Sequence, residues 1–530
     1  MKRFLLIGAV VSGLTVAIAW SQWQVGEDLD VFGTPVGPSV DTTFAERLQA
    51  VLDEELISQD LMGISAAVIT PSLGTWLGVS GMSNPAAGDS IAPDMLFCAG
   101  SITKTYVAAL VLNLAEEGRL SLDDSLHQWL PSYPNIDSTI TIRQLLNHTS
   151  GIYNIVNNPA WLDSIFTNPT RYWTPEEVLL TFVKEPSFPP GSDWEYSNTN
   201  YIVLGMIIIE ATQSKVSTEL KSRFLDPLNL NSTFLFPEDV LQGDLAEGWS
   251  DLDHDGTLEG PVSAPDTAGY SSTWTASGVF ATAEDVAKWA AALYGGEVLS
   301  QSYLQQMLTI SPPSTAYGLG VARRHYFGRD LWGHAGDVVG YRTYMFYSPK
   351  DHISITVFVN QLSSFSMSSI FTRLLYVALI NEYQLPVPDL DPYAIQLGNI
   401  AANASPVDTT FWIYNRGVAP DTIYASLDYD NADTNAVLVD PMTFVLAPGD
   451  SQGITFTIMP SLLESKRYVI KITFDSRYDP DLGYVNLKKT IVFTIESPTA
   501  IADHMTAFPK SCAFEQNYPN PFNRSTTIIY

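Results

Sequence analysis

Apolar residues recur with helical spacing after residue 103 of this chain. From Val107 to Leu114 they follow the i, i+3, i+4, i+7 spacing that places side chains on one helix face. Gly118 closes the run and is suited to a helix C-terminal cap. Three later segments show the same period, at residues 198–211, 283–293 and 366–383. We therefore predict a helix over residues 103–117 that buries one face, and three further helices.

Alternating polar and apolar residues predict strands in two parts of the chain. The first part contains three such runs and a hairpin turn, at residues 63–70, 341–347, 353–359 and 348–351. After Pro388 the pattern changes to short alternating runs separated by turn residues, including 410–414, 454–458 and 490–495. These lengths and spacings are typical of an immunoglobulin-like β-sandwich. We predict an α/β domain of the α+β type, followed by that sandwich.

The first residues have the composition of an export signal. Two basic residues, Lys2 and Arg3, precede an apolar run that ends in Ala17-Ile18-Ala19. The run is short for a membrane anchor and is interrupted by small polar residues. No cysteine follows it, so a lipid-modified anchor is not expected. We predict a signal peptide and export to the periplasm, the cell surface or the medium.

These patterns divide the chain into five segments. They are a signal peptide at 1–19, a linker at 20–43, the α/β domain at 44–385, the β-sandwich at 392–498, and a linker with a tail motif at 499–530. The sandwich is either a spacer or adhesion module or a packing appendage of the first domain.

Composition and charge narrow the choice of partners. The 530 residues carry a formal net charge of −30, from 57 acidic and 27 basic residues. Such a surface repels nucleic acid and anionic membranes, so we expect neither as a partner. A hydrophobic content of 46% is that of a globular protein. Of the two cysteines, Cys98 reads as a small buried apolar residue and Cys512 lies in the tail, so we predict no disulfide bond.

Ser101 and Lys104 are placed to form a nucleophile and its base. A serine hydroxyl becomes a usable nucleophile only with a base within hydrogen-bond reach. On a helix, residues i and i+3 are neighbours, so the lysine would lie beside the serine. The positive end of the helix would stabilise developing negative charge and, with burial, would lower the pKa of Lys104. Ser-x-x-Lys occurs once in the chain, but by itself it is a weak signal.

Two further segments supply polar groups suited to acyl transfer. Tyr196 and Asn198 form a Tyr-x-Asn motif, in which the phenol can move a proton and the amide can hold a carbonyl. His334 and Gly336 lie just before the late pair of strands, where glycine would let a substrate approach the strand edge.

Neither of these two motifs is specific by itself. Tyr-x-Asn recurs at Tyr133, Tyr429, Tyr484 and Tyr518, and a second His-x-Gly begins at His254 in an acidic loop. His148, in Asn147-His148-Thr149-Ser150-Gly151, could pair with a serine, but a structural role at a helix end is the better interpretation.

The order of the three motifs resembles that of the serine hydrolases of the β-lactamase superfamily. The similar branch contains class C β-lactamases, D-alanyl-D-alanine carboxypeptidases, D-aminopeptidases and related esterases. Further similarity lies at residues 97–122, 142–151, 197–205 and 277–289, so the resemblance spans roughly 45–384. It implies a β-lactamase/transpeptidase-like domain with an antiparallel sheet flanked by helices and an all-helical subdomain.

The resemblance also implies a two-step acyl transfer without a cofactor. Ser101 would attack the carbonyl, with Lys104 and Tyr196 sharing the general acid–base work. The backbone N–H groups of Ser101 and Asp337 would form the oxyanion hole. The implied substrate-binding residues are Asn198, His334, Ala335 and Gly336. The substrate would be a small molecule, an ester or a short peptide; a catalytically inactive cell-surface binding or scaffold protein is the alternative.

The third motif bears on the choice of substrate. Relatives that hold a carboxylate often carry Lys or Thr in and just after this motif, whereas this chain has Ala335 and Asp337. An aspartate that faces the pocket would repel a carboxylate. We therefore expect a neutral ester, or an amide or peptide with a free amine, rather than a penicillin.

Two remaining segments indicate interactions outside the site. Residues 515–523 resemble the opening of the C-terminal sorting domain of the type IX secretion system of Bacteroidetes-like bacteria, and the tail looks truncated. Its expected partners are secretion machinery or cell-surface material. Asp251, Asp253 and Asp255 resemble half of a calcium loop, but Val262 replaces its bidentate glutamate, which favours a solvated acidic turn and no metal.

Overall fold

The computed structural model describes most of the chain in two compact units. The described residues are 44–251, 258–262, 267–383, 388–391, 394–415, 419–429, 435–476 and 486–496. The larger unit runs to Ala378 and the smaller begins at Leu379, within one helix. The predicted signal peptide and the sorting motif lie outside the described residues. Among the described residues, no helix is long and apolar enough to cross a membrane.

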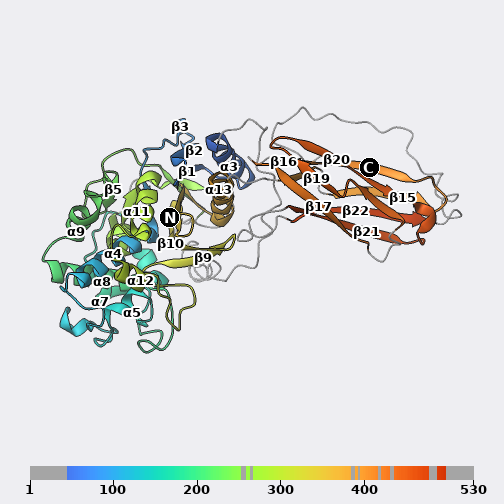
Figure 1. Cartoon of the computed structure of the whole chain (residues 1–530). Coiled ribbons are helices and arrows are strands. Elements are labelled where there is room, and N and C mark those ends of the chain that lie inside the picture. The colour runs from blue at the N-terminus through green and yellow to red at the C-terminus, as the bar shows by residue number, and fades with distance from the viewer. Residues whose placement is uncertain are drawn as a thin grey trace. The chain divides into compact units, whose positions relative to one another are not determined.

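A seven-stranded antiparallel sheet forms the centre of the larger unit (Figure 1). Its order is β3-β2-β1-β12-β11-β10-β9. The bounds are β1 Gly63–Thr70, β2 Gly74–Asn84, β3 Asp89–Ser90, β9 Ala322–Tyr326, β10 Arg329–Val338, β11 Tyr341–Ser348 and β12 Ile353–Val359. The predicted strands at 63–70, 341–347 and 353–359 are thereby confirmed. Every residue of β11 and β12 is buried, because helices cover both faces of the sheet.

Different helices cover the two faces. The ring of Phe371 in α13 packs on Tyr344 and Phe346 of β11 from one side. On the other side, the hydroxyl of Ser354 in β12 donates to the carbonyl of Ala287 in α11. The helix bounds are α3 Phe44–Ser58, α4 Thr103–Glu116, α5 Ile142–Leu146, α6 Pro159–Thr167, α7 Pro175–Phe182, α8 Asn198–Thr212, α9 Val216–Leu220, α10 Thr267–Thr273, α11 Ala283–Gly295, α12 Gln301–Leu308 and α13 Met367–Glu382.

Helix α4 is the buried centre of the helical side. The four predicted helices are all present, and Gly118 has the left-handed φ of 70° expected after a helix C-terminus. The predicted apolar stripe of α4 is buried, and so are its other faces, because nearly every residue from Thr103 to Ala115 is buried. The second face packs on α11, where the rings of Tyr106 and Trp289 stack with centroids 4.1 Å apart. A helix enclosed in this way holds its first residues in a fixed position.

The smaller unit consists of two sheets around one apolar core. Their orders are β14-β16-β20-β18 and β15-β22-β21-β17-β19. The bounds are β14 Pro388–Asp391, β15 Ala394–Ala401, β16 Val407–Asn415, β17 Asp421–Asp428, β18 Val437–Asp440, β19 Thr443–Leu446, β20 Ser451–Ile458, β21 Arg467–Ser476 and β22 Asn486–Glu496. Phe411 of one sheet meets Phe474 of the other edge to face. The predicted runs at 410–414, 454–458 and 490–495 are strands, while the immunoglobulin type stays a prediction.

A buried ion pair ties the start of β10 to the turn between β11 and β12. The Nε atom of Arg329 lies 3.0 Å from Oδ2 of Asp351, and both side chains are fully buried. The hydroxyl of Ser348 donates to the same carboxylate, and Arg329 also donates to the carbonyl of Phe327. Removing one partner of such a pair leaves a buried charge without compensation.

We therefore expect Asp351→Ala to lower the free energy of unfolding of the larger unit by about 3–5 kcal/mol. Denaturant unfolding followed by tryptophan fluorescence measures this loss. Asp330→Ala is the matched control, because Asp330 pairs with Arg323 and His325 on the surface. Asp330→Ala should lower the free energy of unfolding by less than about 1 kcal/mol. Equal losses in the two variants would contradict the structural role of the buried pair.

Candidate active site

Ser101 lies in a single 3₁₀ turn, Gly100–Ile102, immediately before α4. The turn follows β4 (Phe97–Cys98), which belongs to a short sheet with β8 (Val279–Ala281) and β5 (Thr233–Leu235). The serine therefore stands at the N-terminal end of α4, as the helical pattern predicted, although the residues around it form a 3₁₀ turn. Lys104 is nevertheless its neighbour, because the 3₁₀ turn continues directly into the helix.

The amine of Lys104 is enclosed by three hydrogen-bond partners. Its Nζ lies 3.0 Å from Oγ of Ser101, 2.8 Å from Oδ1 of Asn198 and 2.8 Å from the carbonyl oxygen of Ala276. The residue is 0% exposed, and burial holds its pKa well below the usual value of 10.5. A neutral amine donates two hydrogen atoms and keeps one lone pair. With Asn198 and Ala276 as acceptors, that lone pair faces the hydroxyl of Ser101.

Tyr196 and Asn198 come to the same amine from the start of α8. The ring centroid of Tyr196 lies 4.8 Å from Nζ of Lys104. Burial raises the pKa of the phenol, as does the charge of Asp337 to a smaller degree, while a hydrogen bond with Ser101 opposes the rise. The backbone N–H and the side-chain amide of Asn198 both donate to Oδ1 of Asn154, which orients the Asn198 oxygen toward Lys104.

The His334-x-Gly336 segment of β10 closes the site from the sheet. A Cβ atom on Gly336 would lie 2.3 Å from the Ala99 carbonyl and 2.9 Å from the Ser101 backbone nitrogen, so only glycine fits. A Cβ on Gly100 would lie 3.3 Å from the backbone nitrogen of Asp337. The N–H groups of Ser101 and Asp337, which are expected to form the oxyanion hole, thus lie on two segments whose backbones are in close contact.

His334 is held neutral by its surroundings. Its Nδ1 lies 2.6 Å from the carbonyl oxygen of Ala335, and its Nε2 lies 3.0 Å from the hydroxyl of Tyr317. The carbonyl can only accept, so Nδ1 carries the proton and Tyr317 donates to Nε2. Burial, and then the charge of Lys104, lower the pKa of His334 to about 3. The imidazole therefore brings no positive charge to the site near neutral pH.

The side chains of Ala335 and Asp337 point to the other face of the sheet. Asp337 pairs with Arg342 at 3.1 Å, and Ala335 lies opposite Tyr344, which packs under α13. Adjacent residues of a strand alternate between faces, so both side chains point away from His334 and Ser101. The expectation that the Asp337 carboxylate repels substrate from within the pocket is not supported, because the group is paired on the far face.

Several contributors were not found by sequence reasoning. They are the Ala276 carbonyl, Asn154 and Tyr317, together with the ring of His148, whose contact with Tyr196 was not expected. Tyr317 stands in Tyr-Gly-Leu-Gly just before β9, and such a glycine-rich approach to a strand was its only signal. A carbonyl group such as that of Ala276 leaves no trace in a motif.

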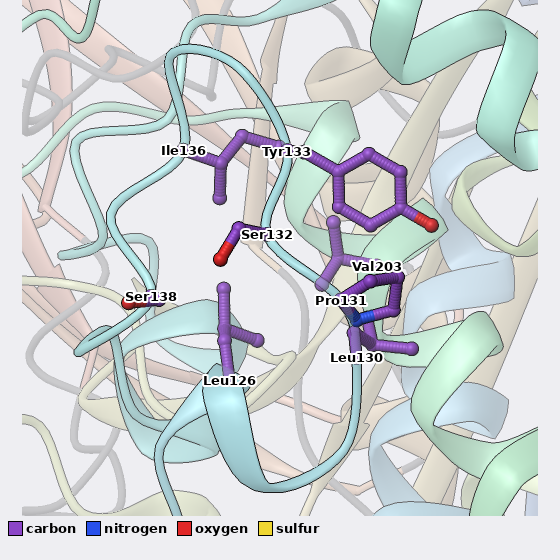
Figure 2. A pocket seen from close by; sticks show the side chains of 8 residues that line it. All are labelled: Leu126, Leu130, Pro131, Ser132, Tyr133, Ile136, Ser138 and Val203. Carbon is purple, nitrogen blue, oxygen red and sulfur yellow. The ribbon is translucent and has the colours of Figure 1, made fainter.

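The competing motifs lie elsewhere or outside the described residues. Tyr133 lines a separate pocket together with Leu126, Ile136 and Val203 (Figure 2). His254 and most of the acidic segment with Asp253 and Asp255 are outside the described residues, where the calcium interpretation stays a prediction. Within the described part of the chain, no cluster of His, Cys, Asp or Glu could hold a metal ion.

The larger unit is similar in sequence and fold to known proteins. The sequence model described as "Beta-lactamase" matches residues 40–378. Penicillin-binding protein 4 of Amycolatopsis lactamdurans is 27% identical over 348 residues, which cover 61% of this chain and 87% of that protein. Esterase EstB of Burkholderia gladioli is 31% identical over 211 residues, covering 37% and 53%. Several curated relatives are matched over little more than half their length.

A solved structure extends the similarity to the fold. The D-stereospecific amidohydrolase from a Streptomyces species has a TM-score of 0.55 and 28% sequence identity. The alignment covers 61% of this chain and 96% of that structure. The predicted β-lactamase/transpeptidase-like fold of the larger unit is thereby confirmed.

The environment of Lys104 leads to a pH prediction. In Asn198→Asp, a carboxylate would stand at the position 2.8 Å from Nζ. An opposite charge stabilises the ammonium form, so the pKa of Lys104 should rise and less neutral amine should be present near pH 7. The rate of Ser101 labelling by a fluorophosphonate should fall at least about tenfold at that pH and recover as the pH rises, since one pKa unit corresponds to about a tenfold change.

The matched control is Asn113→Asp, which makes the same change on α4, the helix of Lys104, but beside Arg223. Its labelling rate should keep the pH profile of the unmodified protein. An unchanged profile in Asn198→Asp would show that Lys104 does not govern the reactivity of the serine.

Proposed function

Because the chain belongs to the Beta-lactamase family, we propose that it is an exported serine hydrolase that forms an acyl-enzyme on Ser101. The observation that carries this proposal is the three-partner environment of Lys104. Its lone pair is directed at the serine hydroxyl by two other acceptors, and burial favours the neutral form. This is the arrangement that nucleophilic catalysis by serine requires.

The first step is attack of Ser101 on a substrate carbonyl. The proton of Oγ passes to Nζ of Lys104 as the Oγ–carbon bond forms and the carbonyl oxygen becomes an oxyanion. The backbone N–H groups of Ser101 and Asp337 stabilise that oxyanion. The proton then reaches the leaving oxygen or nitrogen through Lys104 and Tyr196, as the bond to the leaving group breaks. The products are the acyl-serine and a neutral alcohol or amine.

The second step is hydrolysis of the acyl-serine. Water gives a proton to the neutral amine of Lys104, directly or by relay through the phenol of Tyr196, as its oxygen attacks the ester carbon, and Ser101 recovers a proton from Lys104 when the acid leaves. Asn198 holds the substrate carbonyl or amide during both steps. No cofactor is needed, because all proton transfers use groups of the chain.

The substrate class follows from His334. The site presents a neutral imidazole whose two nitrogens are already bonded to Ala335 and Tyr317, so no cation from the third motif meets a substrate carboxylate. We therefore propose that a neutral ester, or an amide or peptide with a free amine, is preferred over a penicillin. The neutral imidazole of His334 thus replaces repulsion by the Asp337 carboxylate as the reason to expect this preference.

Export is supported by the basic and apolar pattern of residues 1–19. The immunoglobulin-like sandwich and the sorting motif would then serve contact with the cell surface or secretion machinery. A catalytically inactive surface protein is the alternative function, and a test of the nucleophile separates the two.

A fluorophosphonate probe tests the nucleophile. We expect the unmodified protein to be labelled and Ser101→Ala to lose essentially all labelling, because the probe reacts only with an activated serine. Ser192→Ala, which removes an exposed serine hydroxyl, is the control and should be labelled normally. Intact-protein mass spectrometry measures the adduct. A folded protein that resists the probe would support the inactive alternative.

A substrate panel tests the class. We expect a higher kcat/KM on p-nitrophenyl acetate or D-alanine amide than on nitrocefin or a D-Ala-D-Ala peptide. His334→Lys would add a cation, so the ratio of carboxylate-bearing to neutral substrates should rise at least about fivefold. His325→Lys makes the same change at an exposed position of β9 and should leave this ratio of substrate preferences unchanged. Rapid turnover of nitrocefin without esterase or amidase activity would refute the proposed class.

A further inference from the structure

His148 contacts Tyr196 and both of its neighbours in the chain. The carbonyl oxygen of His148 accepts the N–H of Glu195 at 3.1 Å, and its Nδ1 accepts the N–H of Ser197 at 3.2 Å. Its ring packs on the Tyr196 ring with centroids 4.4 Å apart. His148 is 0% exposed and has a φ of 63°, the left-handed conformation. One residue thus holds the phenol and the backbone on each side of it.

The orientation of the His148 ring is determined by its partners. A backbone N–H can only donate, so Nδ1 is the unprotonated nitrogen and Nε2 carries the proton. The amide of Asn200 lies 3.2 Å from the same Nδ1, and its Oδ1 accepts the hydroxyl of Ser150 at 2.7 Å. The hydroxyl can only donate to that oxygen, which leaves the amide nitrogen directed at His148. The hydrogen bonds from Ser150 to Asn200 and from Asn200 to His148 therefore fix the orientation of the imidazole.

This ring is unsuited to exchanging protons with the serine. Burial is the main cause that holds the pKa of His148 well below its usual value of 6.5. Its Nδ1 is occupied by the backbone N–H of Ser197 and the amide of Asn200 and so has no free lone pair for the serine proton. The histidine at this helix end thus has a structural role, and the residues that it supports belong to the candidate site.

Tyr196 needs such support because no regular element holds it. It precedes α8, and the next residue, Ser197, has the extended angles φ −136° and ψ 118°. A reacting group must be held within a fraction of an ångström of its productive position. We propose that His148 is a positioning residue, which keeps the Tyr196 phenol against Lys104 and Ser101. This inference rests on the proposed function.

A double-mutant cycle tests the proposal. His148→Asn removes the ring, while the Asn oxygen can still accept the Ser197 N–H and asparagine tolerates a φ of 63°. The single-turnover acylation rate constant on p-nitrophenyl acetate should fall on the order of 10²-fold. The substrate dissociation constant should stay within about threefold, because the phenol acts in proton transfer rather than in binding.

Tyr196→Phe provides the second arm, since it removes the hydroxyl and keeps the ring. In this background, His148→Asn should lower the acylation rate constant by less than about threefold, because the group that His148 positions is already absent. A general structural role would reduce the rate by the same factor in both backgrounds. Equal factors, or no effect of His148→Asn in the unmodified protein, would overturn the proposal.

Thermal melting identifies variants that fail to fold. If His148→Asn is among them, Asn200→Asp takes its place in the same cycle, because it replaces the donor that fixes the imidazole with an acceptor and leaves the histidine present. The outcomes for the two proposals are separate. Absence of any acylation in the unmodified protein defeats the proposed function, whereas normal acylation with additive effects defeats only the role of His148.

Discussion

The candidate site depends on one constraint, which is a lysine amine that is buried with no carboxylate among its hydrogen-bond partners in the described part of the chain. Lys104 is 0% exposed, and the groups bonded to it are a hydroxyl, an amide oxygen and a backbone carbonyl. Burial of an ammonium ion without a counter-charge is unfavourable, so the enclosure itself selects the free base. The enclosed α4, the turn that carries Ala276 and the start of α8 all serve to maintain this environment.

The second requirement is close approach of two backbones. Gly336 of β10 leaves no room for a Cβ atom between the sheet and the nucleophile, and Gly100 of the 3₁₀ turn adopts a left-handed φ of 54° against it. The hydroxyl of Thr343 in β11 donates to the Ala99 carbonyl and joins the same two segments. In the proposed mechanism, the reaction at Ser101 would therefore take the Asp337 oxyanion N–H group from the sheet and its base from the helices. The aromatic cluster of Tyr196, Tyr317 and the two histidines fills the space between them.

Much of this arrangement could be predicted from local sequence. The spacing of Ser101 and Lys104 determines their contact, and strand alternation located β1, β11 and β12. No strand was predicted over β10, so the placement of Asp337 on the opposite face from His334 and its pairing with Arg342 emerge only from the structure. The bond from Tyr317 to His334 joins segments with no shared pattern, and the Ala276 carbonyl is independent of side-chain identity. Such contacts are set by tertiary packing, which one sequence does not display.

The pairing of β1 with β12 has a consequence for how the protein folds during its synthesis. Ile64 lies opposite Val359, so the middle of the central sheet joins the two ends of the larger unit. Pairing over such a sequence separation gives a high contact order, and chains of this kind fold slowly because a long loop must close first. During synthesis, the serine and its lysine are made early, but the sheet that carries the Asp337 N–H group is completed only when β12 has emerged. Under the proposed function, an incomplete chain would therefore lack a formed catalytic centre until β12, the last strand of this sheet, has paired.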